Sequence, residues 1–67
     1  MDSVIIGQRL RALRGNRSQA DIANAIGVTT MAISQYENGE RIPRDEIKIK
    51  LSALFGVSVD NIFFSVE

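Results

Sequence analysis

The chain has 67 residues, and its eight basic and eight acidic side chains give a formal net charge of zero. It contains neither cysteine nor histidine, which excludes disulfides and thiolate metal sites and removes the usual general base and the commonest zinc ligand. No apolar run approaches the roughly 18 residues of a membrane span, and the N-terminus lacks a signal-peptide pattern. One small domain covering residues 1–67 of a soluble cytoplasmic protein is therefore expected.

The first predicted helix covers about residues 3 to 14 and is followed by a turn. Three apolar side chains recur on it at helical spacing, namely Ile6, Leu10 and Leu13. Gly7 lies inside this helix, where glycine costs about 1 kcal/mol relative to alanine. The pair Gly15-Asn16 is a turn signal that ends the helix.

The second and third predicted helices are short and are joined by a tight turn. Ser18 is a good N-cap, and Asp21 three residues later makes an acidic variant of the capping box. Gly27 suits a helix end with positive φ, and Thr29 suits the N-cap of a third helix from about residue 30 to 38. One face of the second helix carries small and apolar residues: Ala20, Ile22, Ala23 and Ile26.

The third predicted helix has a small apolar stripe and a polar outward face. It is expected to bury little beyond Ile33 and part of Tyr36, with Ala32 at its side, so it is marginal as an isolated helix. Two helices at a steep angle around a glycine turn form a helix-turn-helix, whose second helix enters the major groove of DNA. The outward face carries Thr30, Met31, Ser34 and Gln35.

The C-terminal third is predicted to form two further helices. Pro43 suits the first turn of the fourth helix, which stops at Gly56. Ser58 is a candidate cap for a short fifth helix through Phe63. No segment alternates strongly enough for a core strand, so the predicted fold is all-α with five helices. The apolar residues of the fourth helix are Ile47, Leu51, Leu54 and Phe55.

The segment 18–39, SQADIANAIGVTTMAISQYENG, resembles the helix-turn-helix motif of the Cro/phage-repressor (XRE-type) family. The wider pattern runs from IGQRLRALR to GVSVDNIF and covers nearly the whole chain. This resemblance implies a compact lambda-repressor-like domain that binds double-stranded DNA sequence-specifically as a transcriptional regulator. It further implies a repressor that binds a near-palindromic operator as a homodimer, with no cofactor, no metal and no small-molecule ligand.

The outward face of the third helix supplies the candidate base-reading residues, which are Thr30, Met31, Ser34 and Gln35. A glutamine can form two hydrogen bonds with adenine, and the methyl groups of threonine and methionine suit the thymine methyl group. The alternative interpretation is an ordinary exposed helix face.

The candidate phosphate contacts surround this helix. Gln19 stands at a helix start, where free N–H groups also attract phosphate. Asn38 is a cap and turn residue in the position of a family phosphate contact. Arg17 replaces a residue that is usually apolar, so it either reaches the DNA backbone or covers the edge of the core with its stem. Arg41 and Arg44 match phosphate contacts of the family, with plain solvated arginines as the alternative.

One ion pair is expected from the resemblance, between Arg14 late in the first helix and Glu37 of the ENG motif. The alignment that pairs them requires a turn about two residues shorter than usual, and Arg11 is the alternative partner. If the pair is partly buried, removal of one member leaves an uncompensated charge and costs several kcal/mol, about 3 to 5.

The C-terminal region, residues 43–67, is the predicted dimerisation region. Lys48 occupies a position that is usually apolar, and Ile47 and Ile49 point to different sides of the helix. Spare apolar surface on a small domain indicates a partner interface. The predicted interface residues are Ile49, Phe64 and Val66, and the alternative is a monomer in which Phe64 folds back.

Two other classes of function compete with the regulator. Zero net charge favours a protein-interaction module, or an antitoxin-like partner protein, that keeps the fold without binding DNA. Against it stand Gln19, Arg41 and Arg44, which occupy the positions expected for phosphate contacts. A basic face could also be formed by Arg9, Arg11, Arg14 and Arg17. An enzyme is not expected, because the chain lacks histidine, cysteine and a GxxxxGK[ST] nucleotide loop.

Overall fold

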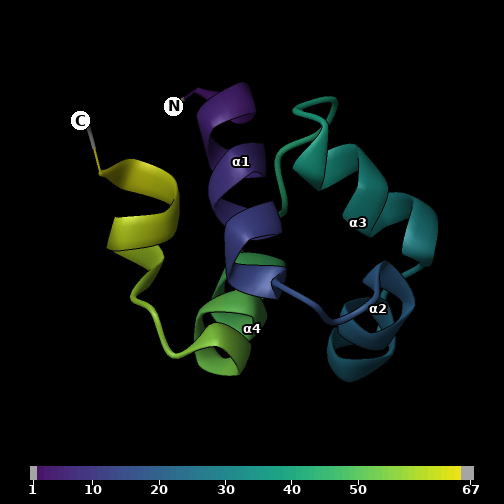
Figure 1. Cartoon of the computed structure of the whole chain (residues 1–67). Coiled ribbons are helices and arrows are strands. Elements are labelled where there is room, and N and C mark those ends of the chain that lie inside the picture. The colour runs from purple at the N-terminus through teal and green to yellow at the C-terminus, as the bar shows by residue number, and fades with distance from the viewer. Residues whose placement is uncertain (1, 66–67) are drawn as a thin grey trace.

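The computed structural model describes residues 2–65, which form five helices and no strand (Figure 1). The helices are α1 (Ser3–Arg14), α2 (Gln19–Ile26), α3 (Thr30–Glu37), α4 (Asp45–Phe55) and a π-helical turn, η1 (Asp60–Phe64). The prediction of an all-α, five-helix fold is confirmed. Over the same residues, no helix has the length and apolar character needed to cross a membrane.

Figure 1 shows α1 in the middle of the molecule, with α2 and α3 on one side and η1 on the other. The chain passes from α3 to α4 in an extended segment, and α4 packs against α2. The two ends of the described chain lie near each other, at the same end of the molecule.

Side-chain caps fix the starts of the first three helices. The Asp2 carboxylate accepts hydrogen bonds from the backbone N–H groups of Val4 and Ile5 at 2.9 and 3.2 Å, a cap that the sequence analysis did not identify. Ser18 and Asp21 form the expected capping box. The Thr29 hydroxyl accepts from the backbone of the third helix at 3.1 Å, as expected for its N-cap. Local hydrogen bonding therefore places the helix-turn-helix boundaries.

The start of α4 differs from the expectation. Pro43 does not occupy the first helical turn: it is buried and precedes the N-cap, which is Arg44. The carbonyl of Arg44 accepts the first bonds of the helix, from Ile47 and Lys48 at 3.0 and 2.9 Å. Proline favours an extended residue before it and has no N–H to satisfy. It therefore suits the extended link in which it stands.

The end of the described chain differs from the expectation in one detail. η1 extends to Phe64 rather than ending at Phe63. The Ser58 hydroxyl accepts from the backbone N–H of Asn61 at 3.1 Å, in the role expected for it. Arg9 of α1 donates to the carbonyls of Ile62 and Ser65, both at 3.0 Å, and so attaches η1 to α1.

All five helices contribute to one hydrophobic core. One expectation about it was wrong: Ala32, which was expected at the side of the third helix, is buried with 6% of its surface exposed, while Ala20 on the second helix is exposed. The third helix buries more than expected, because Tyr36 and Glu37 are also buried. The core consists of Ile6, Leu10, Ile22, Ala23, Ile26, Ala32, Ile33, Tyr36, Leu51, Ile62 and Phe63.

The glycine inside α1 is explained by the approach of α3. A Cβ atom on Gly7 would overlap the carbonyl oxygen of Glu37 and would lie 2.8 Å from the carbonyl oxygen of Tyr36. The backbone at the end of α3 therefore touches the backbone of α1. This close approach sets the position of α3 relative to the core.

Candidate nucleic-acid interface

The α2–turn–α3 unit has the geometry of a helix-turn-helix. Gly27 ends α2 in the left-handed conformation, with φ of 73°, and its N–H donates to the carbonyl of Ala23. Glycine adopts this conformation without steric cost, so the chain can reverse sharply before Thr29 starts α3.

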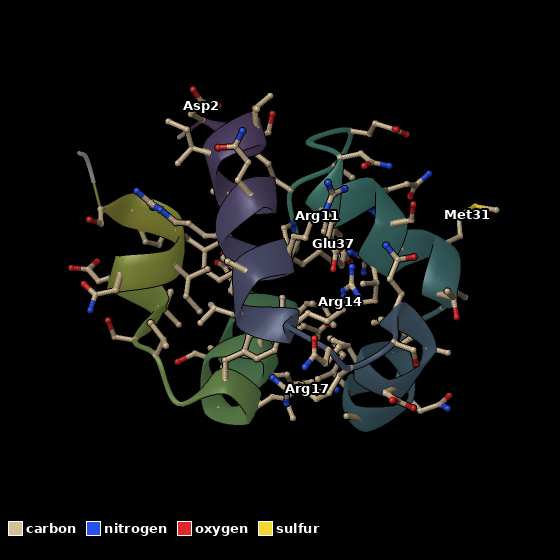
Figure 2. All side chains as sticks on the ribbon, in the orientation of Figure 1. Asp2, Arg11, Arg14, Arg17, Met31 and Glu37 are labelled. Carbon is tan, nitrogen blue, oxygen red and sulfur yellow. The ribbon has the colours of Figure 1, made fainter. Side chains whose placement is uncertain are left out.

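The face of α3 opposite the core carries the four candidate base readers. Thr30 and Met31 are exposed, and 70% of the Met31 surface is accessible. Figure 2 shows Met31 pointing away from the rest of the molecule. Ser34 and Gln35 are half-buried on the next turn. These four side chains form a short row that is available to another molecule, and we call this row the reading face.

A buried carboxylate holds the end of α3 against α1. The Glu37 side chain is 2% exposed and accepts two hydrogen bonds from Arg14, Nε to Oε2 at 2.6 Å and Nη2 to Oε1 at 3.0 Å. Arg14 is the partner with this two-pronged geometry, while the Nε of Arg11 lies 3.6 Å from Glu37 Oε1. In Figure 2 all three side chains converge between α1 and α3.

The charges of this group are mutually stabilised. Burial raises the pKa of the Glu37 carboxyl, but hydrogen bonds from Arg14 and Gln19 and the charges of Arg14 and Arg11 outweigh burial, so the pKa lies below its ordinary value. The hydrogen bond to Glu37 raises the pKa of Arg14 above its ordinary value, against the opposing effect of burial. The pair is therefore ionised at neutral pH.

Gln19 is tied to the same carboxylate. It is the first residue of α2, and its Nε2 donates to Glu37 Oε1 at 3.0 Å. The sequence analysis assigned Gln19 to phosphate binding but did not predict this bond, because the bond joins residues 18 positions apart on different helices.

Asn38 has the cap role expected for it. Its backbone N–H donates to the carbonyl of Ser34 at 2.9 Å, and its side-chain nitrogen lies 3.3 Å from the Ser34 hydroxyl. Its Oδ1 accepts from Nη2 of Arg11 at 3.0 Å. Arg11, with 59% of its side chain exposed, thus borders the end of α3. This contact between Arg11 and Asn38 was not expected from the sequence.

Arg17 lies apart from the reading face, beside α4 (Figure 2). Its guanidinium donates to the carbonyls of Leu13 and Arg14 at 2.9 and 3.2 Å. The same group lies 5.2 Å from the centre of the Phe55 ring. These contacts correspond to the second of its two expected roles, in which the side chain covers the edge of the core.

Arg41 and Arg44 border one open hollow between α3 and α4. The hollow has a volume of about 270 Å³ and is also lined by Thr29, Tyr36 and Glu46, among others. The Arg41 guanidinium lies 5.7 Å from the centre of the Tyr36 ring. Both arginines are exposed, so positive charge is available beside the reading face.

The C-terminal surface has the exposed apolar groups of the predicted dimer region. Ile49 is 63% exposed and Phe64 is 50% exposed, while Val66 lies outside the described residues. Lys48 is buried, with Nζ 3.4 Å from Asp45 Oδ1 and 5.0 Å from the centre of the Phe64 ring. Its ammonium thus has both a carboxylate and an aromatic face as neighbours.

Comparison with known proteins agrees with this geometry. The sequence profile of a family described as helix-turn-helix matches residues 8–62. The chain belongs to the Cro/phage-repressor (XRE-type) helix-turn-helix family. This is a family of DNA-binding transcription regulators and not of enzymes.

Three similar proteins illustrate the relationship. The cryptic phage CTXphi transcriptional repressor RstR of Vibrio cholerae is 32% identical over 47 residues, which are 70% of this chain and 42% of RstR. The P22 c2 repressor, solved in complex with a synthetic operator, is 34% identical with a TM-score of 0.86, covering 90% of this chain and 94% of its own. The restriction-modification controller protein C.AhdI of Aeromonas hydrophila is 30% identical with a TM-score of 0.83, covering 92% and 97%.

These neighbours confirm the predicted lambda-repressor-like fold. The chain spans less than half the length of RstR, whereas it spans nearly all of both solved domains. The likeness to the family therefore extends over nearly the whole DNA-binding domain of these neighbours.

Proposed function

We propose that this member of the family is a sequence-specific transcriptional repressor that binds a near-palindromic operator as a homodimer. The observation that carries the proposal is the two-sided α3 helix. One side is anchored in the core, while Thr30 and Met31 are exposed on the other, with Ser34 and Gln35 beside them. A recognition helix needs this combination, because its base-reading groups must be accessible on a rigid support.

Phosphate contacts around α3 would fix its orientation on the duplex. Gln19, Asn38, Arg41 and Arg44 are the proposed contacts, since they can donate hydrogen bonds to phosphate oxygens. Arg17 is omitted from this set because its guanidinium already donates to two carbonyls beside α4. With zero net charge, affinity would depend strongly on these local contacts and on base readout.

The proposed dimer uses the surface around Ile49 and Phe64, with Val66 as an expected further member. The exposed fractions of Ile49 and Phe64 support this assignment, because burial of such side chains between two copies is favourable. Two recognition helices would then lie about 34 Å apart, in successive major grooves. A dimer placed on a promoter would repress transcription by excluding the polymerase.

The names of the relatives support repression and also allow a neighbouring role. RstR and the P22 c2 protein are named as repressors, and C.AhdI is named as a restriction-modification controller. All three names describe proteins with a controlling role, which agrees with the proposal that this chain is a regulator.

The competing proposal is a protein-interaction module, which the zero net charge favours. A salt titration separates the two. Binding to a mixed-sequence duplex is measured by fluorescence anisotropy at several salt concentrations. For a DNA-binding regulator, the logarithm of the association constant should fall linearly with the logarithm of the salt concentration. Absence of salt-dependent binding by the folded protein would reject the regulator and favour the interaction module.

A further inference from the structure

The Glu37 carboxylate contacts more than its ion-pair partner. Its Oε1 accepts hydrogen bonds from Arg14 Nη2 and Gln19 Nε2, both at 3.0 Å, and lies 3.6 Å from Arg11 Nε. An ion pair that served only to join α1 and α3 would need Arg14 alone. The additional bond connects the buried carboxylate to the first residue of α2.

We propose that Glu37 is a positioning residue for DNA binding, which orients the Gln19 carboxamide so that its N–H groups face a DNA phosphate. This inference rests on the proposed function, because it concerns how one of the proposed phosphate contacts is held. Glu37 itself is 5% exposed, so the proposed role does not require it to touch the DNA. It acts through Gln19.

The chemistry of a carboxylate sets the orientation. An ionised carboxylate can only accept hydrogen bonds, so Gln19 must turn its NH₂ group, and not its carbonyl oxygen, toward Glu37. That nitrogen carries two hydrogens, and Glu37 accepts a hydrogen bond from one of them. A phosphate oxygen is also an acceptor, so the second hydrogen has the polarity that phosphate needs. The reversed carboxamide would present an oxygen and repel the phosphate.

Arg14 keeps the carboxylate itself from rotating. Two parallel hydrogen bonds define the plane of the Glu37 carboxylate, and Arg14 Nη1 donates to the carbonyl of Arg17 at 2.8 Å. Such two-pronged arginine–carboxylate pairs are geometrically specific. The orientation is therefore transmitted from the turn between α1 and α2 through Arg14 and Glu37 to Gln19.

A double-mutant cycle tests this coupling. The four proteins are wild type, Gln19→Ala, Glu37→Gln and the double variant, and the readout is the dissociation constant for an operator-like duplex. Glu37→Gln replaces one of the two oxygens that accept from Arg14 with an NH₂ group, so the two-pronged pair that fixes the plane is lost and Gln19 is no longer held in one orientation. Gln19→Ala should weaken wild type about tenfold, as expected for a hydrogen bond to a charged group, and weaken Glu37→Gln twofold or less.

The controls separate positioning from charge and from folding. Glu40→Gln removes one negative charge from an exposed residue near the end of α3, and Gln19→Ala should keep its full tenfold effect in that background. Equal effects of Gln19→Ala in the wild-type and Glu37→Gln backgrounds would overturn the inference and leave the proposed function intact. Loss of all salt-dependent binding by folded wild type would overturn both.

A second measurement uses the wild-type protein, in case Glu37→Gln does not fold. The two side-chain NH₂ protons of Gln19, which are non-equivalent in any glutamine, should exchange with water at different rates in the free protein, because Glu37 accepts a hydrogen bond from one of them. Addition of duplex should shift the other proton most. Equal exchange rates for the two protons, or no response of either proton to bound DNA, would overturn the inference.

Discussion

Arg14 and Glu37 form a two-pronged ion pair across the contact between α1 and α3, with hydrogen bonds of 2.6 and 3.0 Å. The carboxylate is almost fully buried, whereas 19% of the Arg14 side chain is exposed. Because Glu37 is the last residue of α3, the pair fixes one end of the candidate recognition helix. The same group of side chains would therefore serve both stability and the proposed DNA recognition.

Removal of Arg14 should destabilise the domain severely. Arg14→Ala leaves the Glu37 carboxylate buried without its main partner, so the free energy of unfolding should fall by about 3 to 5 kcal/mol. Urea denaturation followed by circular dichroism measures this. Arg11→Ala is the matched control, since the Arg11 side chain is 59% exposed and lies farther from the carboxylate; its effect should stay within about 1 kcal/mol. Equal losses in both variants would contradict the assignment of Arg14 as the main partner.

Acid should weaken the fold through Glu37. Its pKa is lower in the folded chain than in the unfolded one, so the unfolded chain takes up the proton first as the pH falls. The contribution is complete above the ordinary glutamate pKa of about 4.3 and is lost as the pH falls through the lower, folded value. Urea denaturation between pH 7 and pH 3 should show the stability difference between wild type and Glu37→Gln shrinking below that ordinary value. A difference that stays constant down to pH 3 would argue against the shift.

Alanine at position 7 should destabilise the protein, although alanine is the better helix former. The added methyl group would overlap the backbone of α3, and overpacking of this kind costs about 1 to 3 kcal/mol. Thermal unfolding of Gly7→Ala should thus give a lower midpoint than wild type. The control is the opposite change at an exposed position of the same helix, Ala12→Gly. It measures the effect of helix propensity alone, which should lower the free energy of unfolding by about 1 kcal/mol. A midpoint raised by Gly7→Ala would show that α1 and α3 are farther apart.

Replacement of Gln35 by alanine should relax sequence preference at one position. The candidate side chain lies on the outward half of α3, and loss of a bidentate base contact costs about 1 to 3 kcal/mol of discrimination. The measurement compares affinities for a set of duplexes with single base-pair changes. Asn24→Ala, an exposed change on α2, should leave the whole preference profile unaltered. An unaltered profile for Gln35→Ala would remove Gln35 from the base readers.

Arg44 and Arg17 should respond differently to salt. Arg44→Ala should weaken binding to all sequences alike and reduce the slope of log affinity against log salt by about one, as expected for one lost phosphate contact. Arg17→Ala should leave that slope unchanged, because its guanidinium is occupied beside α4. The reverse pattern, with the slope reduced only by Arg17→Ala, would assign the phosphate contact to Arg17 instead.

Local chemistry made much of the fold predictable from the sequence. The capping box at Ser18, the cap at Thr29 and the turn at Gly27 depend on residues within a few positions of each other, and all three occur as expected. Pro43 was expected in the first turn but lies before the N-cap, because a proline suits both a first helical turn and the extended link before it.

The contacts between helices were less accessible to sequence reasoning. Gly7 was predicted only as a local cost, since the need for glycine arises from the carbonyl groups of α3, 29 to 30 positions away. The bond between Gln19 and Glu37 and the reach of Arg11 to Asn38 likewise depend on how α1, α2 and α3 pack. The presence of several arginines near the first turn indicated the region, but only their geometry distinguishes Arg14, which binds Glu37, from Arg17, which covers Phe55.

The most direct test of the central claim is selection of bound duplexes from a random DNA pool at moderate salt, followed by sequencing. The proposed dimeric regulator should enrich a near-palindrome whose half-sites are separated by about one helical turn, roughly 10 base pairs. The folded protein failing to enrich any sequence would contradict sequence-specific operator binding and direct the search to a protein partner.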